Sequence, residues 1–476
     1  MAILALPLVL LLLPLFLSSD NLHSAGESTT YDRIGLAIRT FWGQAGASFW
    51  TPSTWTVDHN FPLGTAFVFG LPIVFKVDPV GLLRIHSALW AVVASGAMFH
   101  LLRPRVSPIL AACGASAMWW VPTFVRGAVV TGEEAPTIGL MMLGLLWLSR
   151  ARNTPRALLL SCLAVNGMVL FRLDAIFIPP VFAVAGFWIV GGRRAVAYAI
   201  GCGSTTLLHL GVTWGLTGDP LDFARVATRV TEGISLKQSV GATDFLTAIA
   251  GYLGGWLPLG LATLGLVTLL RRGHREGRLI VGVTTWLALG YGLAARVPVL
   301  EVDIGRYFVP LTALLAAMVP LAAESLPKRG LLREGAALGA LILLASVNLG
   351  TIREQAGEAR LEPGLVAASG WLNECAPHLR TLSTHRAPAV QLAAGYRQVP
   401  VHLLNSRWNT DAPKPMGDEL NAKGAQLLVL VGAGPEVQEF RASKVRGWSY
   451  VWQDQEVVIY ARVSAEKHLK LLACGR

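Results

Sequence analysis

The stretch Asp58-His59-Asn60-Phe61-Pro62-Leu63-Gly64 opens an apolar run from Phe61 to Phe75, and the length of this run decides the predicted topology. A membrane-spanning helix needs about 20 apolar residues, so the run is too short to span comfortably. It ends at Lys76-Val77-Asp78-Pro79. We therefore expect it to lie in, or dip into, the membrane interface. The carboxylate, imidazole and carboxamide before its Pro-Leu-Gly turn make Asp58, His59 and Asn60 candidates for a functional loop.

The composition is that of a protein solvated mostly by lipid. Hydrophobic residues make up 53% of the 476 residues and charged residues only 14%, whereas soluble domains carry about 25% charged residues. The net charge of +11 sits in short Lys/Arg clusters between apolar runs, which is typical of membrane orientation. Nucleic acid is therefore not an expected partner, and membrane lipid is.

Apolar runs of spanning length predict an all-α polytopic membrane protein with about 11 transmembrane helices. The first is interpreted as a retained helix because neither a basic residue nor a cleavage site marks a signal peptide. The expected helices lie near 2–18, 82–102, 107–124, 131–149, 157–171, 175–191, 195–215, 246–270, 279–295, 307–323 and 334–350.

The positive-inside rule then orients the chain. With 61–75 outside the membrane core, five basic clusters face one side, which the rule makes cytoplasmic. The amino terminus is predicted to be cytoplasmic, in a multi-pass inner-membrane protein, and the loop 18–60 to lie outside. That loop carries Tyr31, Ile34, Ile38 and Phe41 at helical spacing, typical of a helix at the membrane surface. The five clusters are Arg103/Arg105, Arg150/Arg152/Arg156, Arg193/Arg194, Arg271/Arg272/Arg275/Arg278 and Lys328/Arg329/Arg333.

We predict two domains, a transmembrane module over 1–350 and a small extracytoplasmic α/β domain over 351–476. Two of the five cysteines, Cys375 and Cys474, fall in the second domain, where an oxidising compartment would let them pair. The loose glycine pair Gly432-Ala433-Gly434-Pro435 is weak evidence for a nucleotide site, so no nucleotide cofactor is expected. Expected strands are 381–384, 399–404, 426–431 and 457–463, and expected helices are 365–375, 387–395 and 437–443.

After the basic clusters are assigned to topology, several ionisable residues remain on the predicted outer face. Carboxylates and arginines that converge at one membrane face are suited to transfer of a group from a lipid-borne donor to another partner. Such a transfer needs a carboxylate base and cations or a metal for a departing phosphate. Arginine suits the second task because its planar fork binds phosphate oxygens in pairs. The outer set is Asp20, His23, Glu27, Asp32, Arg33, Arg39, Asp58, His59, Arg126, Glu133, Glu134, Arg172, Asp174, Asp219, Asp222, Arg225, Arg229, Arg296, Glu301, Asp303 and Arg306.

Each of these residues also has an ordinary structural interpretation. Glu133 and Glu134 would favour the positive end of a helix dipole, Arg172 and Asp174 would form a local ion pair, and Arg306 would anchor the membrane interface. The histidines lack a second His or Cys at ligand spacing, so they are expected to be hydrogen-bonding loop residues. These alternatives stay open at the level of sequence.

In the order of its motifs the chain resembles the GT-C class of integral-membrane glycosyltransferases, especially protein O-mannosyltransferases and bacterial aminoarabinose transferases of lipid A. Asp20-Asn21-Leu22-His23 resembles the acidic motif of their first outer loop, and Asp58 to Gly64 resembles their His-Pro-Pro-Leu-like motif. Gly132-Glu133-Glu134-Ala135-Pro136 resembles an acidic position of the second loop that helps to bind a divalent metal. Phe171-Arg172-Leu173-Asp174 and Gly305-Arg306-Tyr307-Phe308-Val309-Pro310 resemble two arginine signatures.

The resemblance implies a fold, a donor and roles for individual residues. The donor would be a polyprenyl-phosphate sugar, the acceptor an unidentified glycan, lipid or protein, and the transfer would invert the sugar carbon. Asp20 or Glu27 would be the base, and Asp58, His59 and Asn60 would shape the donor pocket. Arg172, Arg306 and Tyr307 would hold the phosphate. Asp20 with Glu134 would bind a divalent cation such as Mg or Mn, or Glu134 would instead position the acceptor.

The chain departs from the family at two places: Asn21 stands where the family has Glu, and Asn60-Phe61 where it has His-Pro. Glu27, four residues before Tyr31, also fits the place of the catalytic acid in an alternative alignment. The choice of base therefore stays open, with Asp20 preferred. The competing function is a polytopic transporter or lipid flippase, whose ionisable groups usually lie near the midplane and which often shows inverted repeats. A membrane scaffold without catalysis is the third alternative.

Overall fold

The computed structural model describes Ile3, residues 79–129, 134–221, 241–296, 305–327, 330–357, 363–376 and part of the chain between 379 and 465. The expected first helix beyond Ile3, the amphipathic segment of the first loop and the interfacial run 61–75 lie outside the described residues. The chain divides into two compact units, which are described separately below. The predicted domain boundary at 350/351 stays a prediction.

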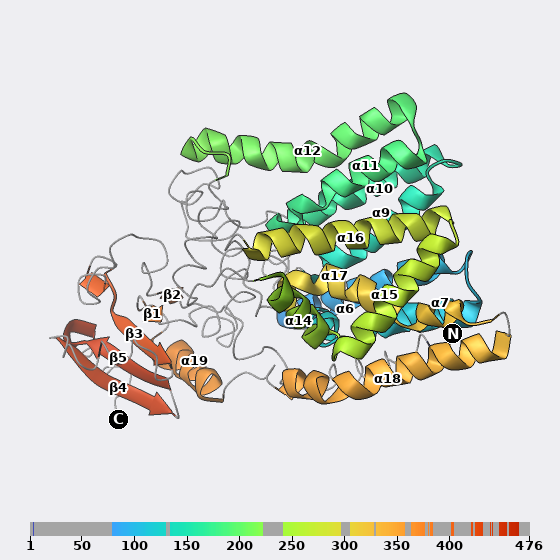
Figure 1. Cartoon of the computed structure of the whole chain (residues 1–476). Coiled ribbons are helices and arrows are strands. Elements are labelled where there is room, and N and C mark those ends of the chain that lie inside the picture. The colour runs from blue at the N-terminus through green and yellow to red at the C-terminus, as the bar shows by residue number, and fades with distance from the viewer. Residues whose placement is uncertain are drawn as a thin grey trace. The chain divides into compact units, whose positions relative to one another are not determined.

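The first unit is a helical bundle (Figure 1). Proline begins many of its helices: it stands at the first or second position of α7, α10, α11 and α17, where its missing N–H costs nothing. The elements are α6 Pro79–Leu102, α7 Pro108–Ala117, η3 Met118–Trp120, α8 Pro122–Val129, α9 Glu134–Arg150, α10 Pro155–Phe171, η4 Leu173–Phe177, α11 Pro179–Ile189, α12 Gly192–Thr217, α14 Ala242–Tyr252, α15 Trp256–Arg271, α16 Arg275–Arg296, η5 Gly305–Phe308, α17 Val309–Met318, η6 Pro320–Ser325 and α18 Gly330–Gly357.

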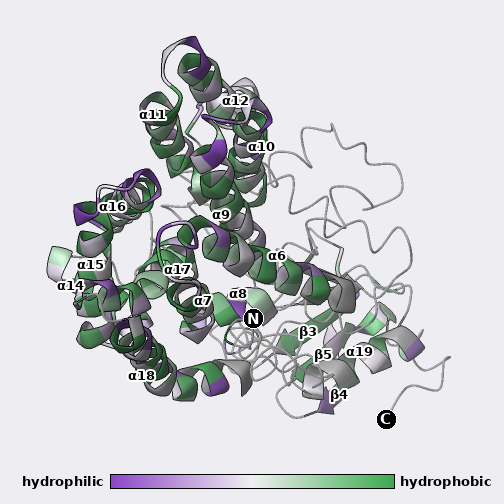
Figure 2. Cartoon of the chain, turned by 90° about the vertical axis from the view of Figure 1, so that its right-hand side faces the viewer, coloured by the Kyte–Doolittle hydropathy of each residue, from purple (hydrophilic) through white to green (hydrophobic). Residues whose placement is uncertain are grey.

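The bundle is apolar both inside and outside. Its interior is packed with side chains such as Trp119, Phe124 and Phe182, which are almost fully buried. Its outer helices nevertheless expose large apolar side chains, for example Leu207 and Leu208 of α12. In Figure 2 most of the helical ribbon is green, and purple is found mainly at turns and helix ends. This distribution fits a bundle surrounded by lipid rather than by water.

Each expected apolar helix from 82 onward appears as a helical segment, but the count of about 11 membrane spans is not confirmed. Within the described residues four helices are long and apolar enough to cross a membrane, and up to six if each bent pair is one span. Several others are shorter than a full span, among them α10 and α11, which have 17 and 11 residues. The observations are consistent with a multi-pass membrane protein.

The single helix expected over 246–270 is wrong, because the segment consists of two helices, α14 and α15, bent by 95°. Gly254 and Gly255 lie between them with φ of 87° and 129°, a conformation that interrupts a helix and that glycine adopts readily. The carbonyl oxygen of Leu253 accepts a 3.1 Å hydrogen bond from Nδ2 of Asn348 on α18. Similarly, the helix expected over 107–124 is bent by 80° where Pro122 starts α8.

The basic clusters lie at one end of the bundle, which we call the basic end. Arg105, after α6, donates to both carboxylate oxygens of Glu276 on α16, at 2.7 and 2.8 Å, and this hydrogen bonding raises the pKa of the guanidinium. Arg275 donates to the carbonyl oxygen of Ile189, just before the turn into α12, and it interacts electrostatically with Arg152.

Two further arginines of the basic end, Arg272 and Arg333, share the Glu324 carboxylate. Described members of four basic clusters are therefore joined directly by these contacts. The fifth cluster, Arg193/Arg194, is at the start of α12, which follows α11 after a short turn. The expectation that the clusters share one end is confirmed, and the side of the membrane that this end faces stays a prediction.

The second unit contains α19 (Pro363–Cys375) and a five-stranded sheet of order β2-β1-β3-β5-β4. The strands β1 (Thr381–Ser383), β2 (Val401–Leu403), β3 (Leu427–Val431) and β5 (Val457–Arg462) match the expected ones. β1 pairs in parallel with both β2 and β3, and β5 is antiparallel to β3. The structure adds β4 (Trp448–Asp454), which the sequence analysis did not include and which forms an antiparallel pair with β5. The second unit therefore contains the small sheet and a helix that the sequence predicts, and its bounds as a domain stay a prediction.

The described cysteines of the bundle and of the second unit differ in their bonding state. Cys113, Cys162 and Cys202 of the bundle are free. Cys375, the last residue of α19, is disulfide-bonded. Cys474, the remaining cysteine of the sequence, lies outside the described residues, as do Gly432 to Pro435 and most of the expected helices 387–395 and 437–443.

Candidate functional site

Three residues from three of the motifs meet at one place in the bundle, and we call them the Arg172 cluster. Nη1 of Arg172 donates a 3.0 Å hydrogen bond to Oε1 of Glu134, and the two side chains form an ion pair. The guanidinium carbon of Arg172 lies 5.6 Å from the centre of the Tyr307 ring. Both charged side chains are buried, with 4% and 10% of their surfaces exposed. The alternative of an Arg172–Asp174 pair is not tested, because the Asp174 side chain lies outside the described part.

Glu134 is positioned by the start of α9. As the first residue of that helix it lies at the positive end of the helix dipole, where a carboxylate is favoured. α8 approaches closely: a Cβ added to Gly127 would lie 3.0 Å from Cβ of Glu134. The expected helix-start role of Glu134 and its pairing with Arg172 therefore coexist.

Arg172 is positioned by the end of α10. Its backbone leaves the helical conformation with φ −143° and ψ 127°, and its N–H still donates to the carbonyl oxygen of Met168 at 2.9 Å. The following η4 is held by Trp286 of α16, whose Nε1 donates to the carbonyl oxygen of Phe177 at 2.8 Å. The backbone at Arg172 is therefore held by α10 before it and by η4, which α16 contacts, after it.

Tyr307 is fixed by the residue that follows it. Phe308, at the end of η5, is fully buried and lies among three aromatic rings of α14 and α16. Its ring centre is 5.7 Å from that of Phe245, 6.1 Å from Tyr252 and 5.5 Å from Tyr291. Such edge and stacked contacts stabilise a ring in one orientation, so η5 presents Tyr307 to Arg172 from a well-packed base.

His86 is a neighbour of the cluster that the sequence analysis did not identify. Its ring lies 6.1 Å from that of Phe171, the residue before Arg172. Nε2 of His86 accepts a 3.0 Å hydrogen bond from Nε1 of Trp90, and its buried Nδ1 has no hydrogen-bond partner in the described part of the chain. The helical spacing of His86 and Trp90 in an apolar run gave no signal beyond core packing.

The Arg172 cluster lies at the end of the helices opposite to the basic end. α9 is a helix of 17 residues that begins at Glu134 and ends at Arg150, a member of a basic cluster. At 1.5 Å per residue this helix is about 25 Å long. α10 runs back from the basic end to Arg172. One end of the bundle therefore holds the basic clusters, and the other holds the Glu134–Arg172 ion pair beside the Tyr307 ring.

The described residues do not by themselves form a divalent-metal site. One oxygen of Glu134 is already engaged by a guanidinium, whose positive charge opposes a second cation at the same carboxylate. No group of three metal-ligating side chains occurs in the described ranges. Asp20, the other predicted ligand, lies outside them, so metal binding by Asp20 and Glu134 stays a prediction.

The remaining predicted site residues are only partly placed. Asp20, Glu27, Asp58, His59 and Asn60 lie outside the described residues. Arg306 is on η5, directly before Tyr307, but its side chain lies outside the described part as well. Of the predicted set, the structure therefore brings together Glu134, Arg172 and Tyr307.

Comparison with known proteins connects this arrangement to a fold. No family model and no curated protein matches the sequence. The structure is similar to that of ArnT, an aminoarabinose transferase, from Cupriavidus metallidurans bound to undecaprenyl phosphate, with a TM-score of 0.66, 12% identity and coverage of 96% of this chain and 97% of that one.

An oligosaccharyltransferase from Archaeoglobus fulgidus is also similar, in two states. Its complex with Zn and sulfate gives a TM-score of 0.56 at 11% identity, covering 97% of this chain and 73% of the other. Its complex with an inhibitory peptide and a dolichol-phosphate gives 0.52 at 12% identity, covering 96% and 74%. These similarities extend over nearly the whole chain, and the protein has the fold of the GT-C class of membrane glycosyltransferases.

Proposed function

We propose that this protein is an inner-membrane glycosyltransferase that moves a sugar from a polyprenyl-phosphate donor to an acceptor at the outer face. The observation that carries the proposal is the Arg172 cluster: a buried arginine, held by a carboxylate and an aromatic ring, at the end of the bundle opposite the basic end. The similarity to ArnT with undecaprenyl phosphate and to the oligosaccharyltransferase with dolichol-phosphate supports the same donor class.

The transfer reaction requires a cation close to the departing phosphate, and Arg172 is suited to this role. In the transfer, the bond between the sugar carbon and the phosphate oxygen breaks, and a bond between that carbon and the acceptor oxygen forms. The acceptor proton passes to a base, and the polyprenyl phosphate leaves with the bonding electrons. A fixed guanidinium in a site of low dielectric stabilises this leaving charge, and Arg172 would take that role.

Glu134 would orient Arg172 rather than act directly on the sugar. A carboxylate paired with a guanidinium limits the rotamers of the arginine and offsets the cost of burying its charge. The Tyr307 ring would hold the guanidinium through a cation–π contact. With both supports in place, the cation needs little reorganisation when the phosphate arrives.

The other roles follow the motif resemblance. Asp20 or Glu27 would be the base, Asp58, His59 and Asn60 would shape the donor pocket, and Arg306 would be a second phosphate-binding cation. Attack from the side opposite the leaving phosphate would invert the sugar carbon. A divalent cation remains part of the proposal because the Archaeoglobus structure carries Zn.

The proposed orientation has two independent supports. The basic end would face the cytoplasm by the positive-inside rule, so the Arg172 cluster would face outward. The disulfide at Cys375 is of the kind found in oxidising compartments, which favours an extracytoplasmic second unit.

A transfer assay tests the proposal. The purified full chain in vesicles would be incubated with a panel of radiolabelled polyprenyl-phosphate hexoses and pentoses and a membrane extract as the source of acceptors. We expect label to leave the polyprenyl lipid for an acceptor in the wild type, and Arg172→Gln to reduce the rate at least about tenfold. Arg353→Gln is the matched control, because Arg353 is an exposed arginine near the end of α18.

The same assay distinguishes a glycosyltransferase from a transporter or lipid flippase. Movement of intact labelled lipid between the two leaflets, without cleavage of the sugar–phosphate bond, would indicate a transporter or flippase and would contradict the proposal. Absence of both cleavage and lipid movement across the whole panel would contradict it as well.

A further inference from the structure

A pocket of about 400 Å³ lies at the basic end, far from the Arg172 cluster. It is formed by the loop after α6, the start of α7, the end of α15, η6 and the start of α18. Its polar lining side chains are Arg105, Ser107, Arg272, Glu324, Arg333 and Glu334. None of them has a role in the proposed transfer reaction.

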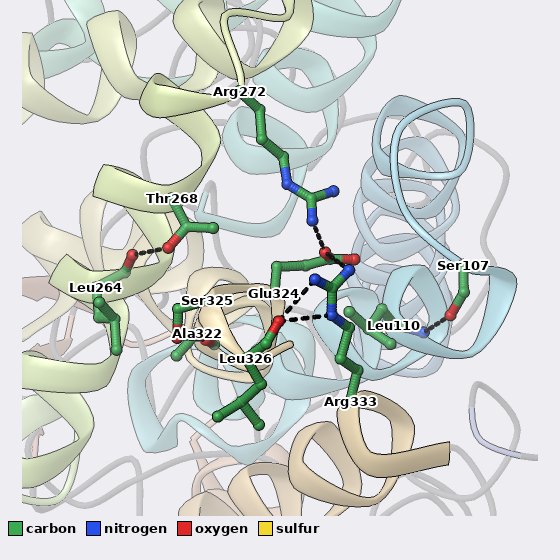
Figure 3. A network of polar contacts seen from close by, with 10 residues as sticks. All are labelled: Ser107, Leu110, Leu264, Thr268, Arg272, Ala322, Glu324, Ser325, Leu326 and Arg333. Carbon is green, nitrogen blue, oxygen red and sulfur yellow. Dashed lines mark hydrogen bonds and ion pairs between the residues drawn. The ribbon is translucent and has the colours of Figure 1, made fainter. Parts of the chain in front are cut away.

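The pocket is organised around a buried carboxylate (Figure 3). Oε2 of Glu324 accepts hydrogen bonds from Nη2 of Arg272 and, at 2.9 Å, from Nη1 of Arg333. Arg333 also donates from Nε and Nη2 to the carbonyl oxygen of Leu326, at 3.0 and 2.6 Å. Arg333 is thus fixed on two sides and has most of its donors engaged.

Arg272 differs from Arg333 in its remaining donors. Its guanidinium makes one hydrogen bond within the described residues, to Glu324, out of the five N–H donors that an arginine carries. Its side chain is 26% exposed, compared with 5% for Glu324. One carboxylate therefore sets the direction of Arg272 and leaves donors for an incoming anion.

Two helix starts add to the positive potential of the pocket. Pro108 begins α7 and Gly330 begins α18, and neither helix has an acidic residue in its first turn. The unpaired N–H groups of a helix start favour anions, phosphate in particular. Oγ of Ser107 accepts a 3.3 Å hydrogen bond from the N–H of Leu110 in α7. The Ser107 hydroxyl group can still donate a hydrogen bond to a ligand.

The local charge balance also favours an anion. The described segments 103–107, 271–278, 324–327 and 330–334 together contain seven arginines and three glutamates. The acidic residues Glu276 and Glu324 are each bound to arginines. The excess of positive charge around the pocket is therefore not neutralised by these segments.

We propose that this pocket binds the phosphate of an anionic phospholipid headgroup. Arg272 would supply the principal donors, and Arg105 and the start of α18 would complete the cradle. Large apolar side chains next to the pocket in sequence are exposed: Leu331 and Leu332 on α18 are 88% and 49% exposed, and Leu270 on α15 is 49% exposed. This apolar surface would receive acyl chains, which favours a lipid over a free phosphate ion. The proposal does not depend on the transfer reaction.

The test measures lipid binding to the delipidated full chain in detergent. We would determine the melting temperature and, by native mass spectrometry, the bound lipid during titration with dioleoyl-phosphatidylglycerol, dioleoyl-phosphatidylcholine or inorganic phosphate. We expect phosphatidylglycerol to stabilise the wild type at lower concentration than phosphatidylcholine. Arg272→Gln should raise the phosphatidylglycerol concentration needed at least about tenfold.

Two further variants make the result interpretable. The single variant Arg272→Gln leaves the Glu324 carboxylate with one cation. The double variant Arg272→Gln with Glu324→Gln removes the charges of both partners. It should lose the preference for phosphatidylglycerol to the same extent as the single variant. Arg156→Gln is the matched control, since Arg156 is exposed at the start of α10, in a basic cluster outside the pocket, and it should bind as the wild type does.

Three results would overturn the proposal. One is equal stabilisation by phosphatidylglycerol and phosphatidylcholine. A second is unchanged phosphatidylglycerol binding in the Arg272/Glu324 double variant. The third is stabilisation by inorganic phosphate equal to that by phosphatidylglycerol, which would identify the ligand as the free ion.

Discussion

Arg172 at the end of α10 donates a 3.0 Å hydrogen bond to Glu134 at the start of α9, although 38 residues separate them in sequence. Because α9 and α10 are joined by a short turn at the basic end, the far ends of the two helices are brought together. The two helices thus place a buried cation and its partner at the end of the bundle where the proposed reaction occurs.

The first prediction concerns this ion pair. Glu134→Gln should destabilise the protein by about 3 kcal/mol, because it removes the carboxylate charge from the ion pair with the buried Arg172 guanidinium. The double variant Glu134→Gln with Arg172→Gln should be less destabilised than the sum of the single variants. Melting temperatures of the four proteins in one detergent measure the coupling, and purely additive shifts would show that the pair does not act as a unit.

The second prediction concerns the ring of Tyr307, whose centre lies 5.6 Å from the guanidinium carbon of Arg172. A cation over an aromatic face contributes about 0.5–2 kcal/mol. Tyr307→Phe keeps the ring and should retain most of the polyprenyl-phosphate affinity, whereas Tyr307→Leu should weaken it several-fold. A Phe variant as weak as the Leu variant would assign the effect to the hydroxyl group instead.

The third prediction tests how closely α15 packs against α17. A Cβ added to Gly265 would meet the backbone carbonyl oxygen of Met318, whereas one added to Gly260 of the same helix would meet nothing within 4 Å. Gly265→Ala should therefore destabilise the bundle by about 1–3 kcal/mol, and Gly260→Ala should leave the melting temperature unchanged or raise it, because alanine is the better helix former. Equal shifts for the two variants would contradict this packing.

The fourth prediction concerns the side of the membrane on which the second unit lies. A reporter enzyme that is active only in the periplasm should be active when fused after Arg476. Cys375→Ser should abolish a mobility difference between reduced and non-reduced protein on gels. An inactive periplasmic reporter, together with a fluorescent cytoplasmic one at the same position, would place the second unit inside and reverse the proposed orientation.

The positions of the apolar helices, the common end of the basic clusters and most strands could be predicted from the sequence. Apolar run length, positive charge between runs and period-two alternation are local signals. The bend between α14 and α15 was missed because a run of apolar residues suggests one continuous helix. The break depends on positive φ at Gly254 and Gly255 and on a hydrogen bond from Asn348, which is distant in sequence.

The candidate site was predicted less completely. Motif resemblance identified Glu134, Arg172 and Tyr307, but it gave them separate roles, as metal ligand and phosphate-binding residues. That Glu134 pairs with Arg172 depends on the close approach of α8, α9 and α10, which no short motif encodes. Strand β4 was missed for a related reason, because Trp448–Asp454 mixes polar and aromatic residues and is defined by its pairing with β5.

The most direct test of the account is the binding of undecaprenyl phosphate to Arg172 variants. With the purified full chain, native mass spectrometry or microscale thermophoresis would give the affinity for wild type, Arg172→Lys, Arg172→Gln and the control Arg353→Gln. The account predicts an affinity loss of at least about tenfold for Arg172→Gln, a smaller loss for Arg172→Lys, which keeps the charge but not the planar fork, and none for the control. Equal affinity of the wild type and Arg172→Gln would contradict the claim that this buried arginine binds the lipid phosphate.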